Sequence, residues 1–144
     1  MSDKKENSEY LCRRSISTRW MDNDVYGHIN NVNYYSFFDS AVNGFLIEKG
    51  VLDIENGETI GLVVETGCKY FAPLSFPDEI EAGIFVSHIG NSSVRYEIGL
   101  FKKGEAAPAA QGFFVHVYVD RASRRPTSIP EKMKSVLKAI ERTV

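Results

Sequence analysis

The stretch WMDNDVYGHINNVNYYSFFD, residues 20–39, decides how this chain is interpreted. Its polar residues come first and a run dense in aromatic side chains follows, an order that predicts a polar loop leading into a strongly apolar helix. The first turn of a helix presents unpaired N–H groups and a partial positive charge, so a carboxylate held beside it makes a candidate catalytic site. The residues of this loop that suggest such a site are Asp22, Asp24, the turn residue Gly27, His28, Asn30 and Asn31.

The aromatic run predicts one long helix. It begins near Asn30 or Asn31, both of which are good N-cap residues, and continues to about Lys49 before it ends at Gly50. Because the helix is apolar over much of its circumference, we expect other elements to wrap around it. The apolar residues at helical spacing are Tyr34, Phe38, Ala41, Val42, Phe45 and Leu46.

The rest of the chain supplies the elements that could do the wrapping. Alternating apolar residues and turn signals predict strands over residues 10–18, 60–71, 80–86, 94–100 and 111–120. In the last strand Phe113, Val115, Val117 and Val119 share one face, and a short apolar helix follows near the C-terminus. An antiparallel sheet curled around the long helix buries both, which predicts an α+β fold. We expect a flexible tail over residues 1–9 and a single domain over residues 10–144.

Composition narrows the possible functions. The chain has 144 residues, with 43% hydrophobic and 25% charged, as is ordinary for one soluble globular domain. A net charge of -2 gives no general attraction to nucleic acid or to an anionic membrane. No apolar run approaches the roughly 20 residues that span a bilayer. Cys12 and Cys68 lack the spacing of a metal site, so we expect reduced thiols in a cytoplasmic protein.

The segment DNDVYGHINNVNYY, residues 22–35, resembles the D-x-D-x-x-G-H-x-N-N-x-x-Y signature of hotdog-fold acyl-CoA thioesterases, in the branch typified by 4-hydroxybenzoyl-CoA thioesterase. Three later segments resemble later blocks of that family in the same order: FAPLSFPDEI (71–80), IGNSSV (89–94) and DRASRRPTSIP (120–130). The resemblance implies a hotdog fold, in which a five-stranded antiparallel sheet wraps a long central helix. It also implies a homodimer at minimum, with active sites at the subunit interface and a homotetramer as the expected larger assembly.

The resemblance implies roles for three residues of the signature. Asp24 aligns with the family's catalytic carboxylate, which acts as a nucleophile on the thioester carbonyl or as a general base for water. The backbone N–H of Asn31 aligns with the donor that polarises the thioester oxygen, and His28 orients the loop or the substrate. A thioester is already an activated acyl group, so a carboxylate and a preorganised donor suffice without a serine or cysteine triad, and no cofactor is expected.

Further residues are candidates for binding the acyl-CoA substrate. Ser92 and Ser93 fall where relatives contact the pantetheine or phosphates of CoA, and Arg124 could bind the nucleotide phosphates or lie in a solvated turn. Asp39 either satisfies the polar side of the helix or supports the site. The remaining candidates are Gly27, Asn30, Tyr34 and Val64. Asp22 is interpreted as structural, through bonds to loop N–H groups or to an arginine such as Arg19. His88 and His116 are interpreted as ordinary strand residues.

Three other readings of the same residues are weighed against hydrolysis. His28 with Asp22 and Asp24 resembles a set of metal ligands. The sequence offers no convincing further ligand, so no metal ion is expected to bind there. A hotdog hydratase pairs an Asp with a His, and the spacing of Asp24 and His28 differs from that family's pattern. A non-catalytic acyl-CoA or acyl-carrier binding module is disfavoured because a buried carboxylate beside a thioester is costly unless it is used or paired.

Overall fold

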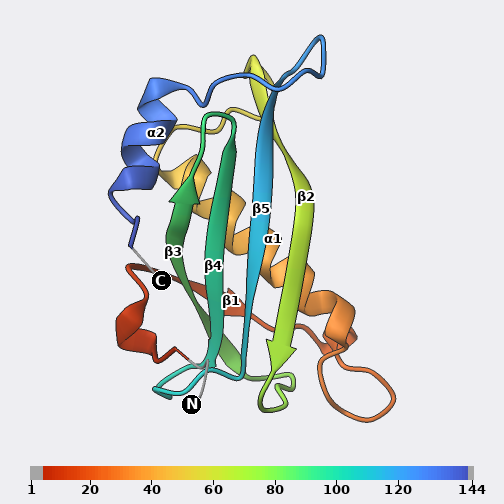
Figure 1. The fold of residues 1–144 in the computed structure, drawn as a ribbon. Helices are drawn as coiled ribbons and strands as arrows, with labels where there is room; N and C mark the ends of the chain where they lie inside the picture. Colours follow the sequence, from red (N-terminus) through yellow and green to blue (C-terminus); the bar gives the residue numbers. More distant parts are fainter. Residues whose placement is uncertain (1–4, 143–144) are drawn as a thin grey trace.

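The computed structural model describes residues 5–142 as one antiparallel sheet wrapped around a long helix (Figure 1). The strands pair in the order β1-β3-β4-β5-β2, and every neighbouring pair is antiparallel. The predicted α+β hotdog architecture is therefore confirmed. The elements are β1 (Cys12–Ser17), α1 (Asn31–Glu48), β2 (Thr59–Tyr70), β3 (Glu79–Ile89), β4 (Ser93–Lys102), β5 (Ala110–Asp120) and α2 (Glu131–Lys138), with short 3-10 helices η1 (Asn7–Glu9) and η2 (Trp20–Asp22).

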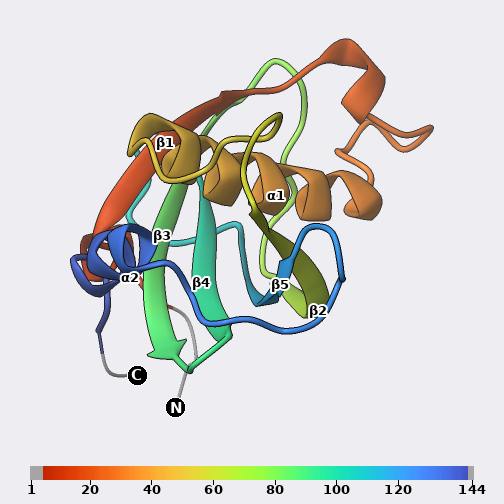
Figure 2. The ribbon, with the colours of Figure 1, turned by 90° about the horizontal axis from the view of Figure 1, so that it is seen from above.

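Helix α1 lies across the concave face of the sheet (Figure 2). Its N-terminus is capped as predicted, because the Asn30 side chain accepts a hydrogen bond from the Val32 N–H at 3.1 Å. Beyond its C-terminus Gly50 adopts a positive φ of 72°, the left-handed conformation that glycine tolerates best. The buried face of α1 is formed by Tyr34, Phe37, Phe38, Ala41, Val42, Phe45 and Leu46.

The side of β5 that packs on α1 is not the one with the most regular apolar alternation. Phe114 and Tyr118 are buried in the main core, and the Phe114 ring lies 5.9 Å from that of Phe38. Phe113, on the opposite face, lies 3.9 Å beneath the Arg95 guanidinium. The apolar alternation over residues 113–119 therefore predicted the strand correctly, but the residues that alternate lie on the face directed away from α1. The pattern is ambiguous because this sheet carries apolar side chains on both faces.

The outer face of β3 and β4 is covered by the N-terminal segment. Tyr10 is buried in a small cluster with Phe85 and Phe101, and its ring lies over Gly83 and Gly99, where an added Cβ would come within 2.6 Å of it. The structure describes residues 5–9 of the expected tail, and these include η1. The Asn7 N–H donates a hydrogen bond to the Ala106 carbonyl at 3.0 Å. Residues 1–4 lie outside the described residues.

Strand β2 forms one edge of the described sheet and carries apolar residues into solvent. Leu62 and Val63 are exposed, and Val64 is 59% exposed. The pairing with β5 shifts register between Val63 and Glu65, so the irregularity of this strand is a bulge at Val64. An exposed apolar edge of this kind is a template for pairing with another chain.

Among residues 5–142, neither helix has the length and apolar character needed to cross a bilayer.

Candidate active site

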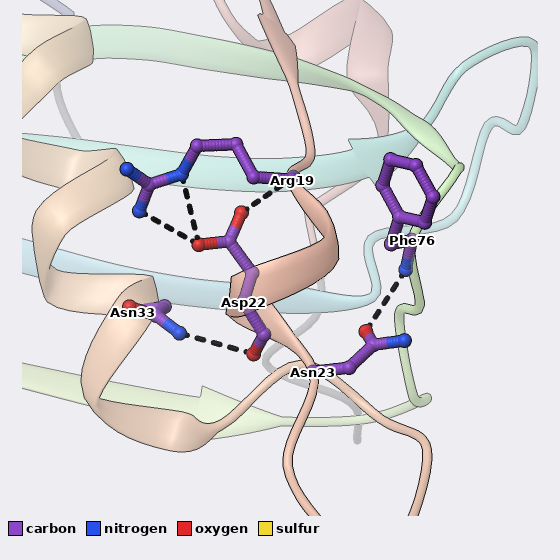
Figure 3. A network of polar contacts seen from close by, with 5 residues as sticks. All are labelled: Arg19, Asp22, Asn23, Asn33 and Phe76. Atoms are coloured by element: carbon purple, nitrogen blue, oxygen red, sulfur yellow. Dashed lines mark hydrogen bonds and ion pairs between the residues drawn. The ribbon is translucent and has the colours of Figure 1, made fainter.

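The loop that precedes α1 is built around the buried carboxylate of Asp22, which is only 1% exposed (Figure 3). Its Oδ1 accepts a bond from Arg19 Nη2 at 2.8 Å, and its Oδ2 accepts from the Arg19 backbone N–H at 2.7 Å. The Asp22 carbonyl in turn accepts bonds from the Asn33 side chain at 3.1 Å and from the Asn30 N–H at 2.9 Å. The structural role predicted for Asp22 is confirmed, and through it the loop is fixed to the first turn of α1.

The same loop is anchored to the connection between β2 and β3. The Phe76 N–H donates to Asn23 Oδ1 at 3.0 Å (Figure 3). The Ser75 hydroxyl donates to the Gly27 carbonyl at 2.9 Å, and the Ile29 N–H donates to the Leu74 carbonyl at 2.8 Å. Sequence reasoning missed Asn23 and Ser75, because no local spacing links residues that the fold alone brings together.

We expect Asp22→Ala to lower the free energy of unfolding by about 2 kcal/mol, the scale of losing hydrogen bonds to a buried charged group. The loop should lose its anchor as well, since Arg19 would have no carboxylate to hold. Chemical denaturation measures the first effect, and proteolysis within residues 19–29 measures the second. A matched control is Asp53→Ala, which removes an exposed carboxylate that accepts from the nearby Glu55 and Asn56 N–H groups. Equal losses of stability in the two variants would contradict this role for Asp22.

A pocket of about 420 Å³ opens where this loop meets α1 and the end of β2. Four of the predicted site residues line it: Asp24, His28, Asn31 and Tyr34. Asp24 is held in place because its Oδ1 accepts from the Tyr26 N–H and its own N–H donates to the His28 carbonyl, both at 2.9 Å. The other lining residues are Ile29, Tyr70, Phe71, Ala72 and Pro73. The structure thus places a carboxylate and the N-terminus of α1 on one pocket.

Gly27 and Asn30 shape this pocket without lining it. Gly27 has a φ of 81°, and an added Cβ would meet nothing within 4 Å, so its backbone conformation and not its small size is what the turn requires. Asn30 is the cap of α1, and its side chain is engaged by the Val32 N–H.

The aromatic part of the pocket wall is neutral. The rings of Tyr34 and Tyr70 lie 4.9 Å apart, and burial raises the pKa of both phenols. Burial also raises the pKa of the neighbouring Cys68 thiol, to about 11. These groups therefore stay protonated near neutral pH, and the two tyrosines give the pocket an uncharged aromatic surface.

Five predicted substrate-binding residues lie away from this pocket. Asp39 is exposed on α1 and accepts a bond from the Asn43 side chain at 2.9 Å, while Val64 lies on the free edge of the sheet. Ser92, Ser93 and Arg124 lie at the opposite end of the sheet. Ser93 pairs with Val117, the Ser92 carbonyl accepts from the Tyr118 N–H, and the Arg124 N–H donates to the Asp120 carbonyl at the end of β5. The turn between β3 and β4 and the loop after β5 form the upper part of Figure 1. β5, which has 11 residues, links the two ends and is roughly 35 Å long at the usual rise of a strand.

His116 is a residue whose setting the sequence did not reveal. It is 3% exposed, and its Nε2 has no hydrogen-bond partner among the described residues. Its ring stacks 5.7 Å from Phe114 and lies 5.1 Å from Tyr96. Burial lowers the pKa of His116 to about 4, against a smaller opposing effect of the Asp39 charge. The sequence pattern of the strands does not distinguish His116 from His88, which is exposed. The interpretation of both as ordinary strand residues therefore did not predict that His116 is buried.

Within residues 5–142, no group of three or more His, Cys, Asp and Glu side chains is placed to hold a metal ion.

Comparisons with known proteins agree with this architecture. Residues 18–137 match the family described as the thioesterase-like superfamily. The crystal structure of the PA5185 protein from Pseudomonas aeruginosa PAO1 is similar, with 52% identity, a TM-score of 0.95 and coverage of 98% of this chain and 99% of that one. Slr0204 from Synechocystis, a 1,4-dihydroxy-2-naphthoyl-CoA thioesterase, has a TM-score of 0.80 at 15% identity, with coverage of 88% and 94%. The uncharacterized protein YsmA of Bacillus subtilis is 25% identical over 122 residues, which are 85% of this chain and 82% of that protein.

Proposed function

This chain belongs to the thioesterase-like superfamily, and from that premise we propose that it is an acyl-CoA thioesterase that hydrolyses a fatty or aromatic acyl-CoA to the free acid and CoA. The observation that carries the proposal is the pocket in which the Asp24 carboxylate and the first turn of α1 converge. The aromatic wall formed by Tyr34 and Tyr70 suits an apolar acyl group.

In the proposed reaction the thioester carbonyl lies between Asp24 and the N-terminus of α1. The Asp24 carboxylate either attacks the carbonyl carbon or removes a proton from the water that does so. The Asn31 N–H, which has no intrahelical acceptor at this position, donates to the oxygen as negative charge develops on it. The carbon–sulfur bond then breaks, and CoA leaves as the thiolate. When Asp24 is the nucleophile, water then hydrolyses the mixed anhydride on Asp24, which releases the free acid and restores the carboxylate. His28 lines the same pocket and orients the loop or the substrate.

We also propose that the active unit is a homodimer at minimum, joined through β2, with a homotetramer as the expected larger assembly. The apolar free edge of this strand supports such pairing. If two β2 strands pair antiparallel, the two sheets run in opposite directions. The end of the sheet with Ser92, Ser93 and Arg124 in one copy would then lie beside the end with Asp24 in the other copy. The residues proposed to bind CoA could then reach the thioester across the interface.

The free thiols of Cys12 and Cys68 agree with a cytoplasmic location.

We expect Val64→Lys to weaken the dimer by about 2 kcal/mol, or roughly thirtyfold in Kd, because it places a charge in an apolar interface. Thiol release should fall in parallel at protein concentrations where the variant dissociates. Analytical ultracentrifugation over a dilution series gives the dissociation constant. Ile54→Lys is the matched control, since Ile54 is 66% exposed on the connection before β2 and should tolerate the same change. A Val64→Lys dimer as tight as the wild type would argue against β2 as the interface.

The experiment that tests the proposed function is thiol release from a panel of CoA esters: acetyl- through palmitoyl-CoA, with benzoyl- and phenylacetyl-CoA. Release of CoA with stoichiometric free acid supports hydrolysis, and the preferred ester identifies the acyl group. Binding of the esters without turnover would replace the proposal with an acyl-CoA binding module. Hydration of crotonyl-CoA without thiol release would replace it with a hydratase.

A further inference from the structure

Tyr70 is the last residue of β2 and projects from a firmly held strand end. It pairs with Ala110 of β5, and the next two residues, Phe71 and Ala72, both donate their N–H groups to the Ala109 carbonyl, at 2.8 and 3.1 Å. The end of β2 is therefore fixed against β5 at the rim of the candidate active-site pocket. A side chain that starts from such a strand end has a well-defined position, although the Tyr70 side chain itself is 45% exposed.

The Tyr70 side chain reaches from the sheet to the first turn of α1. Its hydroxyl donates to the Asn31 carbonyl over 3.4 Å, and its ring packs 4.9 Å from that of Tyr34. Burial, followed by the nearby Cys68 thiol, raises the pKa of Tyr70, so the hydroxyl keeps its proton. The Asn31 carbonyl is the backbone acceptor within reach of this hydroxyl, which also interacts with the side chains of Cys68 and Tyr35.

Asn31 supplies the N–H that the proposed reaction needs, and its orientation is set from two directions. The peptide that carries this N–H is turned by the Asn33 N–H, which donates to the Asn30 carbonyl at 3.0 Å. The other end of Asn31 is the carbonyl that Tyr70 holds. A donor to a developing oxyanion works only when it is aimed at the position that the oxygen will occupy, so small rotations of this residue should affect turnover.

We propose that Tyr70 is a positioning residue: its hydroxyl bond to the Asn31 carbonyl ties the end of β2 to the first turn of α1 and aims the Asn31 N–H at the thioester oxygen. The inference rests on the proposed thioesterase function. It adds a residue from outside the loop and helix that carry Asp24 and Asn31, and it assigns to β2 a part in catalysis besides its part in the dimer. The long bond in the free enzyme is expected to shorten when substrate is bound.

The test is Tyr70→Phe, which removes the hydroxyl and keeps the ring against Tyr34. We expect kcat to fall about threefold to tenfold, the scale of one neutral hydrogen bond, with KM unchanged. The melting temperature should stay at the wild-type value, and so should the Kd of a non-hydrolysable thioether analogue of the preferred ester. Ser17→Ala is the control, because it removes an exposed hydroxyl of β1 that donates to Glu79 at 3.1 Å, outside the pocket.

Three results would overturn the inference while leaving the thioesterase proposal intact. The first is a Tyr70→Phe enzyme with wild-type kcat. The second is a raised KM with unchanged kcat, which would assign the hydroxyl to substrate binding. The third is a fall in melting temperature that accounts for the lost activity, which would assign it to stability alone. A wild-type protein that releases no thiol from any ester would overturn the proposed function first, and this inference with it.

Discussion

We expect Asp24→Asn to lower kcat for acyl-CoA hydrolysis by about 10²–10⁴-fold, the range that a general acid–base or nucleophilic group contributes. The amide can neither attack a carbonyl as an anion nor take a proton from water. The substitution keeps the local structure, because Asn retains the Oδ1 atom that accepts from the Tyr26 N–H. Binding of CoA esters and the melting temperature should therefore stay close to the wild type, and steady-state thiol release measures the loss.

Asp53→Asn is the matched control for this variant. Asp53 Oδ1 accepts from the Glu55 and Asn56 N–H groups, both at 3.1 Å, in a turn of the same kind but remote from the pocket. The same chemical change there should leave turnover unaltered. Wild-type activity in Asp24→Asn would falsify the assignment of Asp24, and equal losses in both variants would point to a general effect of removing surface charge.

The second large effect is a loss of stability in mild acid that originates at His116. Its pKa is about 4 in the folded protein against 6.5 in the unfolded chain. Because the folded pKa is lower, the unfolded state binds the proton first. The stabilising contribution is present above pH 6.5 and is lost as the pH falls toward 4. We expect a loss of about 2 kcal/mol between pH 7.5 and 5, and about 3 kcal/mol by pH 4.

The groups that face His116 make this expectation specific. Tyr96 and Tyr118 approach the ring from the sheet and are neutral, with their hydroxyls 3.0 Å apart, so neither compensates a charge on the imidazole. Asp39 on α1 is the carboxylate that favours the protonated form. Burial outweighs it, so the ring should stay neutral through the physiological range.

Urea denaturation between pH 7.5 and 5, at one fixed protein concentration, tests this prediction. His116→Gln should flatten the pH dependence of the unfolding free energy, whatever its stability at pH 7.5. His88→Gln is the control, because His88 is exposed and its replacement should leave the wild-type slope in place. A His116→Gln protein with an unchanged slope would show that other groups cause the acid sensitivity.

Much of the candidate site could be predicted because its geometry is local. The cap by Asn30, the turn at Gly27 and the bond from Arg19 to Asp22 all join residues a few positions apart. Such contacts depend on short spacings that are visible in a single sequence. The same holds for α1, whose predicted limits agree with the observed Asn31–Glu48 within a residue or two.

The loop–helix unit, the succession of strands along the chain and the candidate carboxylate could be predicted from the order of residues alone. Which distant segments meet them depends on the folded structure. It brings Ser75 and Phe76 to the loop, Tyr70 to Asn31, and His116 into the core while His88 stays in solvent. It also separates Ser92, Ser93 and Arg124 from Asp24 by the length of the sheet, which is why the proposed CoA site includes a second copy of the chain. Backbone propensity and short-range spacing act within a few residues, whereas burial and strand pairing depend on the whole chain, so the former could be predicted from the sequence and the latter could not.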